Sequence, residues 1–317
     1  MNLMGTFSVV IVNYNTPKLV GNCVRSVLEL SIADKEDIVV VDNASTDNSF
    51  SYLKETLPTG VRLVRTSINR GFAAGVNFGM VGCMRELVLV LNPDTYFVDA
   101  SLENAVTLFR NHADVGLVGL DLMYPDGERQ FSARRFYSLL DILGRRSPLG
   151  RLEAFKRRID SHMMREAWGA GLPFEAEWVL GTGFIVRRSL FGELGGMDEH
   201  FFLYMEDVDF CARIWQAGYR VLCVPGARLT HEHQRASAAG FLSKAGRRHM
   251  NSLWRFSRKY RVPLFTPPGV QGLMRGAKAR MPPVALPVPV QMPVPVAVPV
   301  GVAAGRPAAA ERAQTVE

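Results

Sequence analysis

The sequence predicts an α/β fold in which a mostly parallel sheet is flanked by helices. Short apolar runs rich in β-branched residues recur in the first third of the chain, and segments with helical spacing separate them. Polar side chains follow where several of these runs end. Strands that alternate with helices form parallel sheets covered on both faces. The 317 residues suffice for one large domain of roughly 250 residues and an appendage.

The expected elements begin with an apolar strand at residues 8–12. Thr16 and Pro17 follow as the N-cap and first residue of a helix, whose apolar positions keep helical spacing from Leu19 to Leu30. Three further strands are expected at residues 38–41, 61–64 and 87–91. The carboxyl ends of such strands form the edge where parallel sheets bind their ligands.

The second half of the chain mixes helices, strands and basic residues. The expected elements are a basic helical region at 131–176, an apolar run at 178–186, a helix at 206–217 and a strand at 220–224. Residues 281–305 carry no charge, and their frequent prolines predict a disordered, polyproline-II-like segment rather than a membrane span. We therefore predict one domain at residues 1–265 and a disordered Pro/Val/Ala-rich tail at 266–317.

Composition and charge exclude several classes of protein. Hydrophobic residues make up 48% of the chain and charged residues 21%, which are globular proportions. The four cysteines lie far apart, which excludes a zinc ribbon or a disulfide scaffold. Residues 1–12 lack the basic start of a signal peptide, so we expect a cytoplasmic protein. Residues 134–168 carry a balance of +5 and residues 244–261 one of +7, which predicts an anionic partner surface.

Polar residues follow three of the predicted strands. They are Asn13, Asn15, Asp42, Asn43, Asn92 and Asp94. No G-x-G-x-x-G loop follows the first strand and no Walker-type loop is present, which excludes a dinucleotide-binding loop and a P-loop. Asp42 suits the N3–H of a pyrimidine base, although a helix-capping turn explains the same pattern. At residues 68–77, glycines and Arg70 come at a predicted helix start, where backbone N–H groups suit a phosphate.

The turn Asn92-Pro93-Asp94 predicts a divalent metal site. It places two oxygen-bearing side chains two residues apart, and Mg²⁺ and Mn²⁺ prefer one or two carboxylates together with diphosphate oxygens. A solvated proline turn is the alternative. Downstream, His231 and His233 are two residues apart and point to opposite faces of an extended segment, so at most one of them is a ligand.

The stretch from Gly195 to Arg213 is the most specific in the chain. It contains three carboxylates within four residues, at Glu206, Asp207 and Asp209. An acidic helix start favoured by the helix dipole is one explanation. The aromatic-rich approach to these acids favours another, in which they lie at a partly buried edge where a base is useful.

Taken together, these motifs resemble a known family. From Ser8 to Ser237 the sequence contains, in order, SVVIVNYN, VVVDNASTD, NRGFAAGVNFG, LVLNPDT, GTGFIVRRSLFGELGGMDEHFFLYMEDVDFCARIWQAGYRV and HEHQRAS. This series resembles family 2 glycosyltransferases of the GT-A fold, a Rossmann-like nucleotide-binding fold. The ending H-x-x-Q-R-x-S is similar to that of rhamnosyltransferase-like members. The resemblance implies a nucleotide-sugar-binding part at residues 1–125 and an acceptor-binding, catalytic part with basic helices at 126–265.

The resemblance also implies roles for individual residues. Asp207 is the implied catalytic base, with Glu206 beside it. Asn92 and Asp94 stand for the family's D-x-D motif, and Asn92 departs from its first aspartate, which leaves Asp94 as the main carboxylate on the metal. His231 completes the metal site. The implied donor-binding residues are Asn13, Asn15, Asp42, Asn69, Arg70, Gly71, Asn77, Asn92 and Asp94.

The implied activity is inverting transfer of a sugar from a nucleotide-diphospho-sugar, with Mg²⁺ or Mn²⁺, to a hydroxyl of a cell-wall or polysaccharide acceptor. The favoured donor is dTDP-rhamnose, and another UDP- or dTDP-sugar is the alternative. A polyprenyl-diphosphate-linked acceptor is expected. A sugar-1-phosphate nucleotidyltransferase would share the sheet, but usually has a Gly-rich N-terminal loop with a basic residue, which is missing here.

The two basic regions predict peripheral binding to the anionic inner face of the cell membrane. Apolar residues interleave with their cations, as in interfacial helices, and we expect Arg145, Arg146, Arg157 and Arg158 to contribute most. Ordinary amphipathic packing on the sheet is the alternative. A nucleic-acid-binding protein is the competing class, because aromatic residues in these regions suit base stacking. These are Phe136, Tyr137, Trp168, Trp254 and Phe256. No nucleic-acid module is recognised, so we do not expect a nucleic-acid partner.

Overall fold

The computed structural model describes residues 3–145, 152–232 and 244–276. Its first strand, β1 (Phe7–Asn13), is buried at every position, as a continuous apolar run requires. Helix α1 (Pro17–Glu29) follows with Thr16 as N-cap and proline in its first turn, as predicted. The other predicted strands form at β2 (Ile38–Asp42), β3 (Arg62–Arg65) and β4 (Leu87–Leu91).

These strands form half of one large mixed sheet. Its order is β3-β2-β1-β4-β10-β6-β11-β5, and β8 (Phe174–Glu175) pairs with β11. The first four strands are mutually parallel. Strand β10 (Gly183–Arg187) runs antiparallel between β4 and β6 (Val115–Met123), and β11 (Arg220–His231) is parallel to β6. The antiparallel β5 (Thr95–Tyr96) closes the edge, and β7 (Ala133–Arg134) pairs with β9 (Trp178–Val179) outside the sheet.

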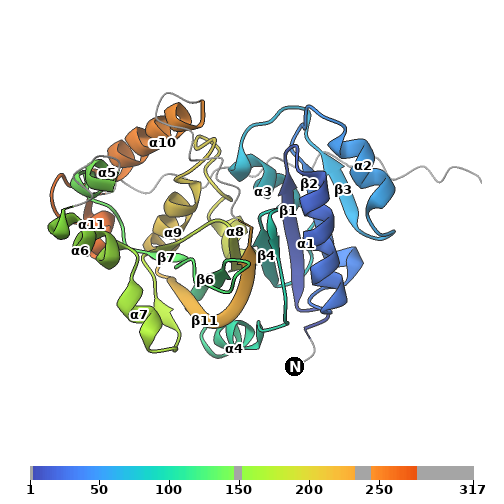
Figure 1. Ribbon diagram of the computed structural model, residues 1–317, viewed down its shortest axis with the longest axis horizontal. Helices are drawn as coiled ribbons and strands as arrows, with labels where there is room; N and C mark the ends of the chain where they lie inside the picture. The colour runs from blue at the N-terminus through green and yellow to red at the C-terminus, as the bar shows by residue number, and fades with distance from the viewer. Residues whose placement is uncertain (1–2, 146–151, 233–243, 277–317) are drawn as a thin grey trace, which may run out of the picture. The chain divides into compact units, whose positions relative to one another are not determined.

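Helices cover both faces of this sheet, which confirms the predicted fold class (Figure 1). Alternate residues of each strand enter different cores: Val9 and Ile11 pack with α1 and α4 (Glu103–Asn111), whereas Val10 and Val12 pack with α3 (Phe72–Met80). The second core also contains α8 (Arg188–Glu193) and α9 (Glu206–Gln216). The shorter α2 (Ser49–Thr56) packs beside α1, and the turn η1 (Lys35–Asp37) precedes β2.

The basic region expected at 131–176 folds as three short helices around the small β7-β9 pair. They are α5 (Leu139–Arg145), α6 (Glu153–His162) and α7 (Arg165–Gly169). The longer α10 (Lys244–Tyr260) and α11 (Gly269–Gly276) complete this half.

The predicted boundary at residue 265 is corrected by α11. This helix packs on α9 and α10, and its Leu273 is buried in the same core. The folded unit therefore includes Gly269–Gly276, which the sequence places in the predicted tail. The Pro/Val-rich stretch at 281–305 lies outside the described residues. Among the helices described, we find none with the length and apolar character that crossing a bilayer requires.

Candidate active site

The ends of β1 and β2 hold Asp42 in a fixed orientation. Asn13 and Asp42 are register partners, and Asn13 donates from Nδ2 to Asp42 Oδ1 at 2.9 Å. Asn13 Oδ1 accepts from the backbone N–H and the hydroxyl of Thr16, which ties the Asn13 side chain to the start of α1. Asp42 is fully buried, and its Oδ2 has Arg65 Nε 3.1 Å away but no aligned hydrogen bond within the described structure. Asp42 Oδ2 therefore keeps acceptor capacity that no hydrogen bond in the described structure uses.

Asn15 and Asn43 join the loops around this carboxylate. Asn15 is in the left-handed region, with φ of 59°, and its side chain exchanges hydrogen bonds with Thr46 in the loop after β2. Buried Asn43 donates to the Gly71 carbonyl at 2.9 Å and accepts from the Thr66 hydroxyl. Asn43 lies outside the set of donor-binding residues implied by the resemblance. Its position at the end of a predicted strand is the one feature of the sequence that indicates a role at the site.

The segment before α3 is held in a narrow space. Asn69 accepts the Gly71 N–H at 2.9 Å. Gly71 has φ of 100°, and a Cβ there would lie 2.1 Å from the Phe202 carbonyl oxygen, so no other residue fits without movement. Phe202 also accepts the Phe72 N–H, so the start of α3 is bound to the segment before α9. Arg70, predicted to face phosphate, pairs with Glu199 at 3.2 Å from an exposed position.

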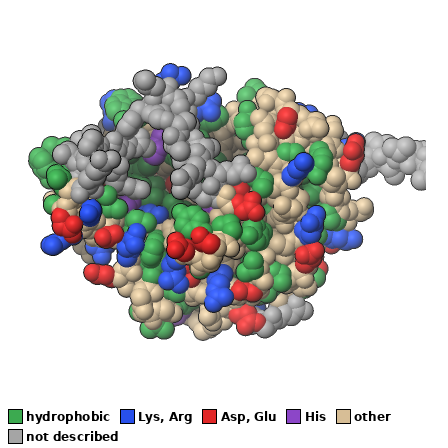
Figure 2. Space-filling model, in the orientation of Figure 1, with side chains coloured by type: hydrophobic (Ala, Val, Ile, Leu, Met, Phe, Trp, Pro, Cys, Tyr) green, Lys and Arg blue, Asp and Glu red, His purple; other side chains and the backbone are tan. Residues whose placement is uncertain are grey.

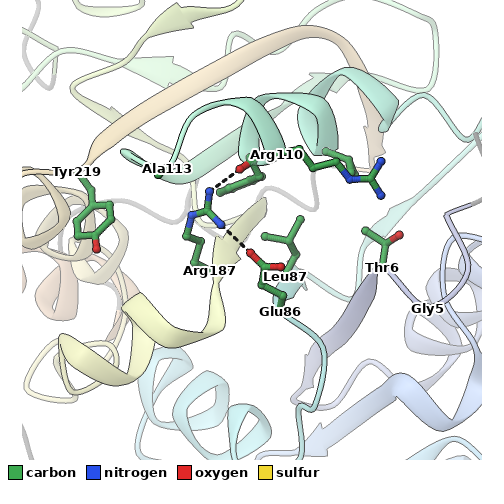
Figure 3. Close-up of a pocket in the computed structure, with 10 residues that line it drawn as sticks. Gly5, Thr6, Glu86, Leu87, Arg110, Ala113, Arg187 and Tyr219 are labelled. Atoms are coloured by element: carbon green, nitrogen blue, oxygen red, sulfur yellow. Dashed lines mark hydrogen bonds and ion pairs between the residues drawn. The ribbon is translucent and has the colours of Figure 1, made fainter.

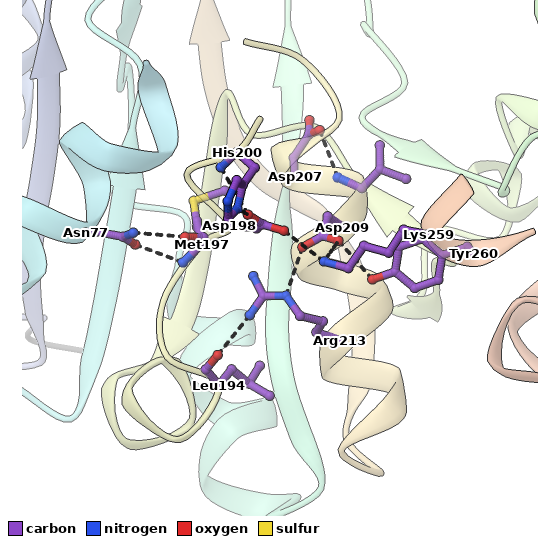
Figure 4. A network of polar contacts seen from close by, with 11 residues as sticks. Asn77, Leu194, Met197, Asp198, His200, Asp207, Asp209, Arg213, Lys259 and Tyr260 are labelled. Carbon is purple, nitrogen blue, oxygen red and sulfur yellow. Dashed lines mark hydrogen bonds and ion pairs between the residues drawn. The ribbon is translucent and has the colours of Figure 1, made fainter. Parts of the chain in front are cut away.

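Asn77, predicted to bind the donor, makes its hydrogen bonds within the protein. It is buried on α3, where its amide donates to the Met197 carbonyl and Glu199 and accepts the Met197 N–H. Figure 4 shows this two-way contact. Its amide NH₂ is thus fully used within the protein. We assign Asn77 a positioning role, holding the segment that leads to the acidic helix.

The predicted metal residues Asp94 and His231 come together at the same sheet edge. Asp94 Oδ2 lies 3.4 Å from His231 Nε2. Gln130 binds His231 twice: its Nε2 donates to the His231 carbonyl and its Oε1 lies 2.8 Å from Nδ1. With Nδ1 donating to that oxygen, Nε2 is left with the lone pair that a metal needs. No cluster of three or more His, Cys, Asp or Glu groups suited to a metal occurs in the described part of the chain.

Asn92 and Asp207 flank a single turn. Thr182 accepts the Asn92 N–H at 2.9 Å, while its neighbour Gly181 donates its N–H to Asp207 Oδ2 at 2.9 Å. The Asp207 carboxylate receives a second backbone N–H from Val208 at 2.8 Å. The turn predicted to bind metal and the acid are therefore brought to one place by β4 and the start of β10.

Burial sets the protonation of the two acids. Burial raises the pKa of Asp207, although the N–H groups of Gly181 and Val208 and the charge of Arg134 oppose the rise. Burial and the nearby Asp207 charge raise the pKa of Glu206 well above its ordinary value. The Glu206 Oε2 is buried without a hydrogen bond in the described structure. Of the two carboxyl groups, Glu206 is therefore the one whose pKa is raised further.

Comparison with known proteins identifies this arrangement. Residues 8–209 match the family described as Glycosyl transferase family 2. The chain belongs to this family. The N-acetylglucosaminyl-diphospho-decaprenol L-rhamnosyltransferase of Mycobacterium tuberculosis is 30% identical over 220 residues, covering 65% of this chain and 70% of that protein. Rhamnosyltransferase WbbL of Escherichia coli is 36% identical over 88 residues, covering 27% of this chain and 32% of its own.

Solved structures confirm the GT-A fold of this glycosyltransferase. The mannosyltransferase PcManGT of Pyrobaculum calidifontis, in complex with GDP-Man and Mn²⁺, has a TM-score of 0.51 at 21% identity and covers 80% of this chain and 61% of its own. GalNAc-T7 with UDP, GalNAc and Mn²⁺ has a TM-score of 0.52 at 19% identity, and the match covers 71% of this chain and 43% of GalNAc-T7. At these identities the likeness concerns the fold.

A polar network fixes the acidic helix of the glycosyltransferase to α10 (Figure 4). Buried Asp209 accepts from Arg213, from the Tyr260 hydroxyl and, at 2.6 Å, from Lys259. Lys259 also binds Asp198 at 2.9 Å. Burial opposes ionisation of Asp198, but Lys259 and His200 outweigh it and lower the pKa of Asp198 to about 2. Asp209, the third acid of the sequence motif, thus stabilises the fold.

The arginines expected to bind membrane in the first basic region are partly used in folding. Arg158 donates to Asp141, to Ser138 and to the Phe265 carbonyl, so its guanidinium is engaged within the fold, and its membrane role stays a prediction. Arg157 is 81% exposed beside Glu153. Figure 2 shows acidic and basic side chains intermingled where Figure 1 draws α6 and α7, in agreement with these pairs. The Arg145 side chain and Arg146 lie outside the described part.

The aromatic residues proposed for base stacking are mostly unavailable. Phe136, Trp168 and Phe256 are each at most 3% exposed and pack in the core, and Tyr137 packs against Trp178. Trp254 alone among the five is well exposed. The structure therefore gives no support to the nucleic-acid alternative.

A pocket of about 680 Å³ lies at the opposite edge of the sheet (Figure 3). It adjoins the starts of β1 and β4 and the end of the antiparallel β10. Its Arg187 pairs with Glu86 and donates to the Phe109, His112 and Val115 carbonyls. These bonds end α4 and join it to the sheet, so we assign this pocket no part in the reaction.

Proposed function

We propose that this glycosyltransferase transfers rhamnose, with inversion, from dTDP-rhamnose to a hydroxyl of a lipid-linked glycan. The observation that carries the proposal is the Asp207 carboxylate, held by the N–H of Val208 and by the N–H of Gly181 on the turn that also binds Asn92. This arrangement leaves a base of raised pKa beside the motif expected to hold the donor. The relative from Mycobacterium tuberculosis, by its name, transfers L-rhamnose to N-acetylglucosaminyl-diphospho-decaprenol, and it supports both donor sugar and acceptor class.

The donor's base would bind at Asp42. The open Oδ2 of this carboxylate suits the N3–H of thymine or uracil, and Asn13 prevents the carboxylate from rotating away. The Gly71 backbone then brings the start of α3, with its positive dipole end, toward the diphosphate side of the site.

The reaction needs one proton transfer by the protein. Asp207 takes the proton of the acceptor hydroxyl while that oxygen attacks the anomeric carbon and the diphosphate leaves. Burial and the Asp207 charge raise the pKa of Glu206, which favours its neutral form and so opposes a second negative charge beside the attacking oxygen. Arg70 lies at the start of α3, where release from Glu199 would let it pair with the leaving diphosphate.

Asp94 and His231 fit a divalent ion shared with the diphosphate. Two ligands at about 2.1 Å from one Mg²⁺ or Mn²⁺ lie about 3 to 3.5 Å apart, and the observed separation is 3.4 Å. Two protein ligands completed by diphosphate oxygens and water are the usual arrangement for such ions. When bound, the ion would stabilise the negative charge of the departing diphosphate.

Asp207→Asn tests the proposed base. Because the amide keeps the shape but cannot take a proton, we expect kcat to fall by at least about 100-fold, while the Kd for dTDP-rhamnose, measured by calorimetry, changes less than about threefold. Glu55→Gln, which neutralises an exposed acid on α2, is the matched control and should transfer normally. Near-wild-type turnover of Asp207→Asn would assign the base elsewhere, and failure to bind any dTDP- or UDP-sugar would refute the donor.

His231→Ala tests the metal site. We expect the Mn²⁺ concentration for half-maximal transfer to rise about tenfold or more, and Gln130→Ala to shift it less, since Gln130 acts through His231. His112→Ala, at the exposed end of α4, should leave the titration unchanged. His233, expected to be dispensable, lies outside the described residues, and equal effects of His231→Ala and His233→Ala would refute the assignment.

A further inference from the structure

Helix α10 has an inner face that is fixed to the catalytic half of the site. Ser252 donates to the Leu203 carbonyl at 3.0 Å, and Lys259 and Tyr260 bind Asp209. Leu253 and Phe256 are buried in the same core as α9. The helix is thus attached directly to the element that carries Asp207, and its rotation about its own axis is determined.

The outer face of α10 combines cations with exposed apolar side chains. Arg247, Met250, Trp254 and Arg258 follow one another at intervals of three, four and four residues, which places them on one side of the helix. Trp254 is 58% exposed and Met250 43%. The Arg258 guanidinium lies 4.7 Å from the centre of a Trp254 ring, so cation and aromatic group form one continuous surface.

The charge of this face is uncompensated by its own helix. Residues 244–261 contain no acidic residue. Lys259 is used by Asp198 and Asp209, and Arg248 lies over the Phe202 ring at 3.9 Å, so both belong to the inner contacts. Arg247 and Arg258 lie exposed on the outer face, and exposed Arg261 follows immediately after the helix. We name Arg247, Met250, Trp254, Arg258 and Arg261 the outer face.

We propose that this outer face lies on an anionic lipid bilayer. Tryptophan and methionine suit the boundary between headgroups and acyl chains, and arginines beside them suit anionic headgroups. A bound nucleic acid or acidic protein would need the cations but leaves the exposed Trp254 and Met250 without an apolar environment. Each cation near an anionic membrane contributes about fivefold in partitioning, so the three together contribute about 100-fold.

The inference deepens the proposed function, because it rests on a lipid-linked acceptor as substrate. With its inner face bound to α9, α10 would hold Asp207 at a fixed height above the bilayer. The acceptor's diphosphate and first sugar project from the membrane surface, so a fixed height selects which hydroxyl meets the base. The membrane contact would thereby take part in choosing the acceptor.

Flotation of the full chain with vesicles tests this surface. We expect binding to vesicles of equal phosphatidylglycerol and phosphatidylcholine, and little binding to phosphatidylcholine alone. Salt at about 0.5 M, which shortens the Debye length to about 4 Å, should release the protein. Changing Arg247, Arg258 and Arg261 to Gln should lower partitioning about 100-fold. Trp254→Ser should weaken binding about tenfold while keeping its salt dependence.

Three comparisons keep the result specific. Changing Lys18, Arg25 and Lys54 to Gln removes the same charge from exposed positions on α1 and α2 and should leave binding unchanged. An equal loss of binding in that control would show that net charge alone binds vesicles and would overturn the proposal. A wild-type protein that does not bind vesicles but shifts DNA in a gel at physiological salt would also overturn it. Asp207→Asn should float like wild type, which separates failure of this surface from failure of the proposed reaction; thermal unfolding of each variant verifies folding.

Discussion

Replacing Lys259 by methionine should lower the free energy of unfolding, because Lys259 links α10 to the acidic helix α9. Lys259 is 18% exposed and bridges two carboxylates, Asp198 and Asp209, that are almost fully buried. Methionine has a similar length and no charge, so the variant removes the cation while keeping much of the packing. Asp209 would keep Arg213 and Tyr260, whereas the Asp198 carboxylate would keep, among the described residues, the ring and the backbone N–H of His200.

The expected loss can be worked out from Asp198. Lowering its pKa from 3.8 to about 2 corresponds to about 2.5 kcal/mol of stability at neutral pH. Breaking a buried pair by removing one partner costs about 3 to 5 kcal/mol, and the partial exposure of Lys259 favours the low end. We therefore expect the free energy of unfolding to fall by about 3 kcal/mol at pH 7.

The pH dependence gives a second measurement from the same urea titrations. A carboxylate whose pKa is depressed in the folded state stabilises the fold above its unfolded pKa and loses that effect as pH falls through the folded value. The difference between wild type and Lys259→Met should therefore shrink as pH falls from about 4 toward about 2.

Lys156→Met provides the control, because Lys156 forms an exposed pair with Glu153 on α6 and should change stability by less than about 0.5 kcal/mol. A loss below about 1 kcal/mol in Lys259→Met at pH 7, or one that is independent of pH, would refute the reasoning.

Two further predictions concern the donor side and the base. Gly71→Ala should cost about 2 kcal/mol of stability and raise the donor KM, because φ is 100° and a Cβ would meet the Phe202 carbonyl. Gly21→Ala in α1, where a Cβ meets nothing within 4 Å, should be neutral or mildly stabilising. Equal effects of the two substitutions would contradict the explanation. The rate of transfer should fall as pH drops through the raised pKa of Asp207, so an acid limb of kcat at or below pH 3.8 would count against Asp207 as the base.

Most of the strands that could be predicted from the sequence are buried on both faces. Residues 8–12, 38–41 and 87–91 are apolar runs buried at every position, whereas 61–64 contains Arg62 and gives the half-buried β3. Each of the four forms a strand within one residue of the predicted bounds. The direction of β10 could not be predicted, because an apolar run looks alike in a parallel and an antiparallel pairing. Strand β11 continues past the predicted end to His231, since a shift in register lets the chain resume pairing with β6 at Arg228.

The candidate site was predictable where chemistry is local and unpredictable where it depends on distant contacts. Asp42, Asp94 and the pair Glu206–Asp207 are marked by strand ends or a helix start in the sequence. Asn77 looked equivalent but is turned into the fold by Met197, 120 positions later. Gln130 gives no local signal at all, and its bond to His231 spans 101 positions. Assigning such residues requires the tertiary structure.

The segment Phe201–Met205 shows why the acidic motif needs contacts from distant parts of the chain. Tyr204 and Met205 are consecutive non-glycine residues with φ of 66° and 70°, a conformation that costs about 1 to 2 kcal/mol for each. Contacts offset this cost on two sides. Phe72 of α3 binds the Phe202 carbonyl, while α10 binds the Leu203 carbonyl through Ser252 and stacks His249 on Tyr204 at 4.5 Å. Because Met205 is the N-cap of α9, these two helices together determine where its first turn places Asp207.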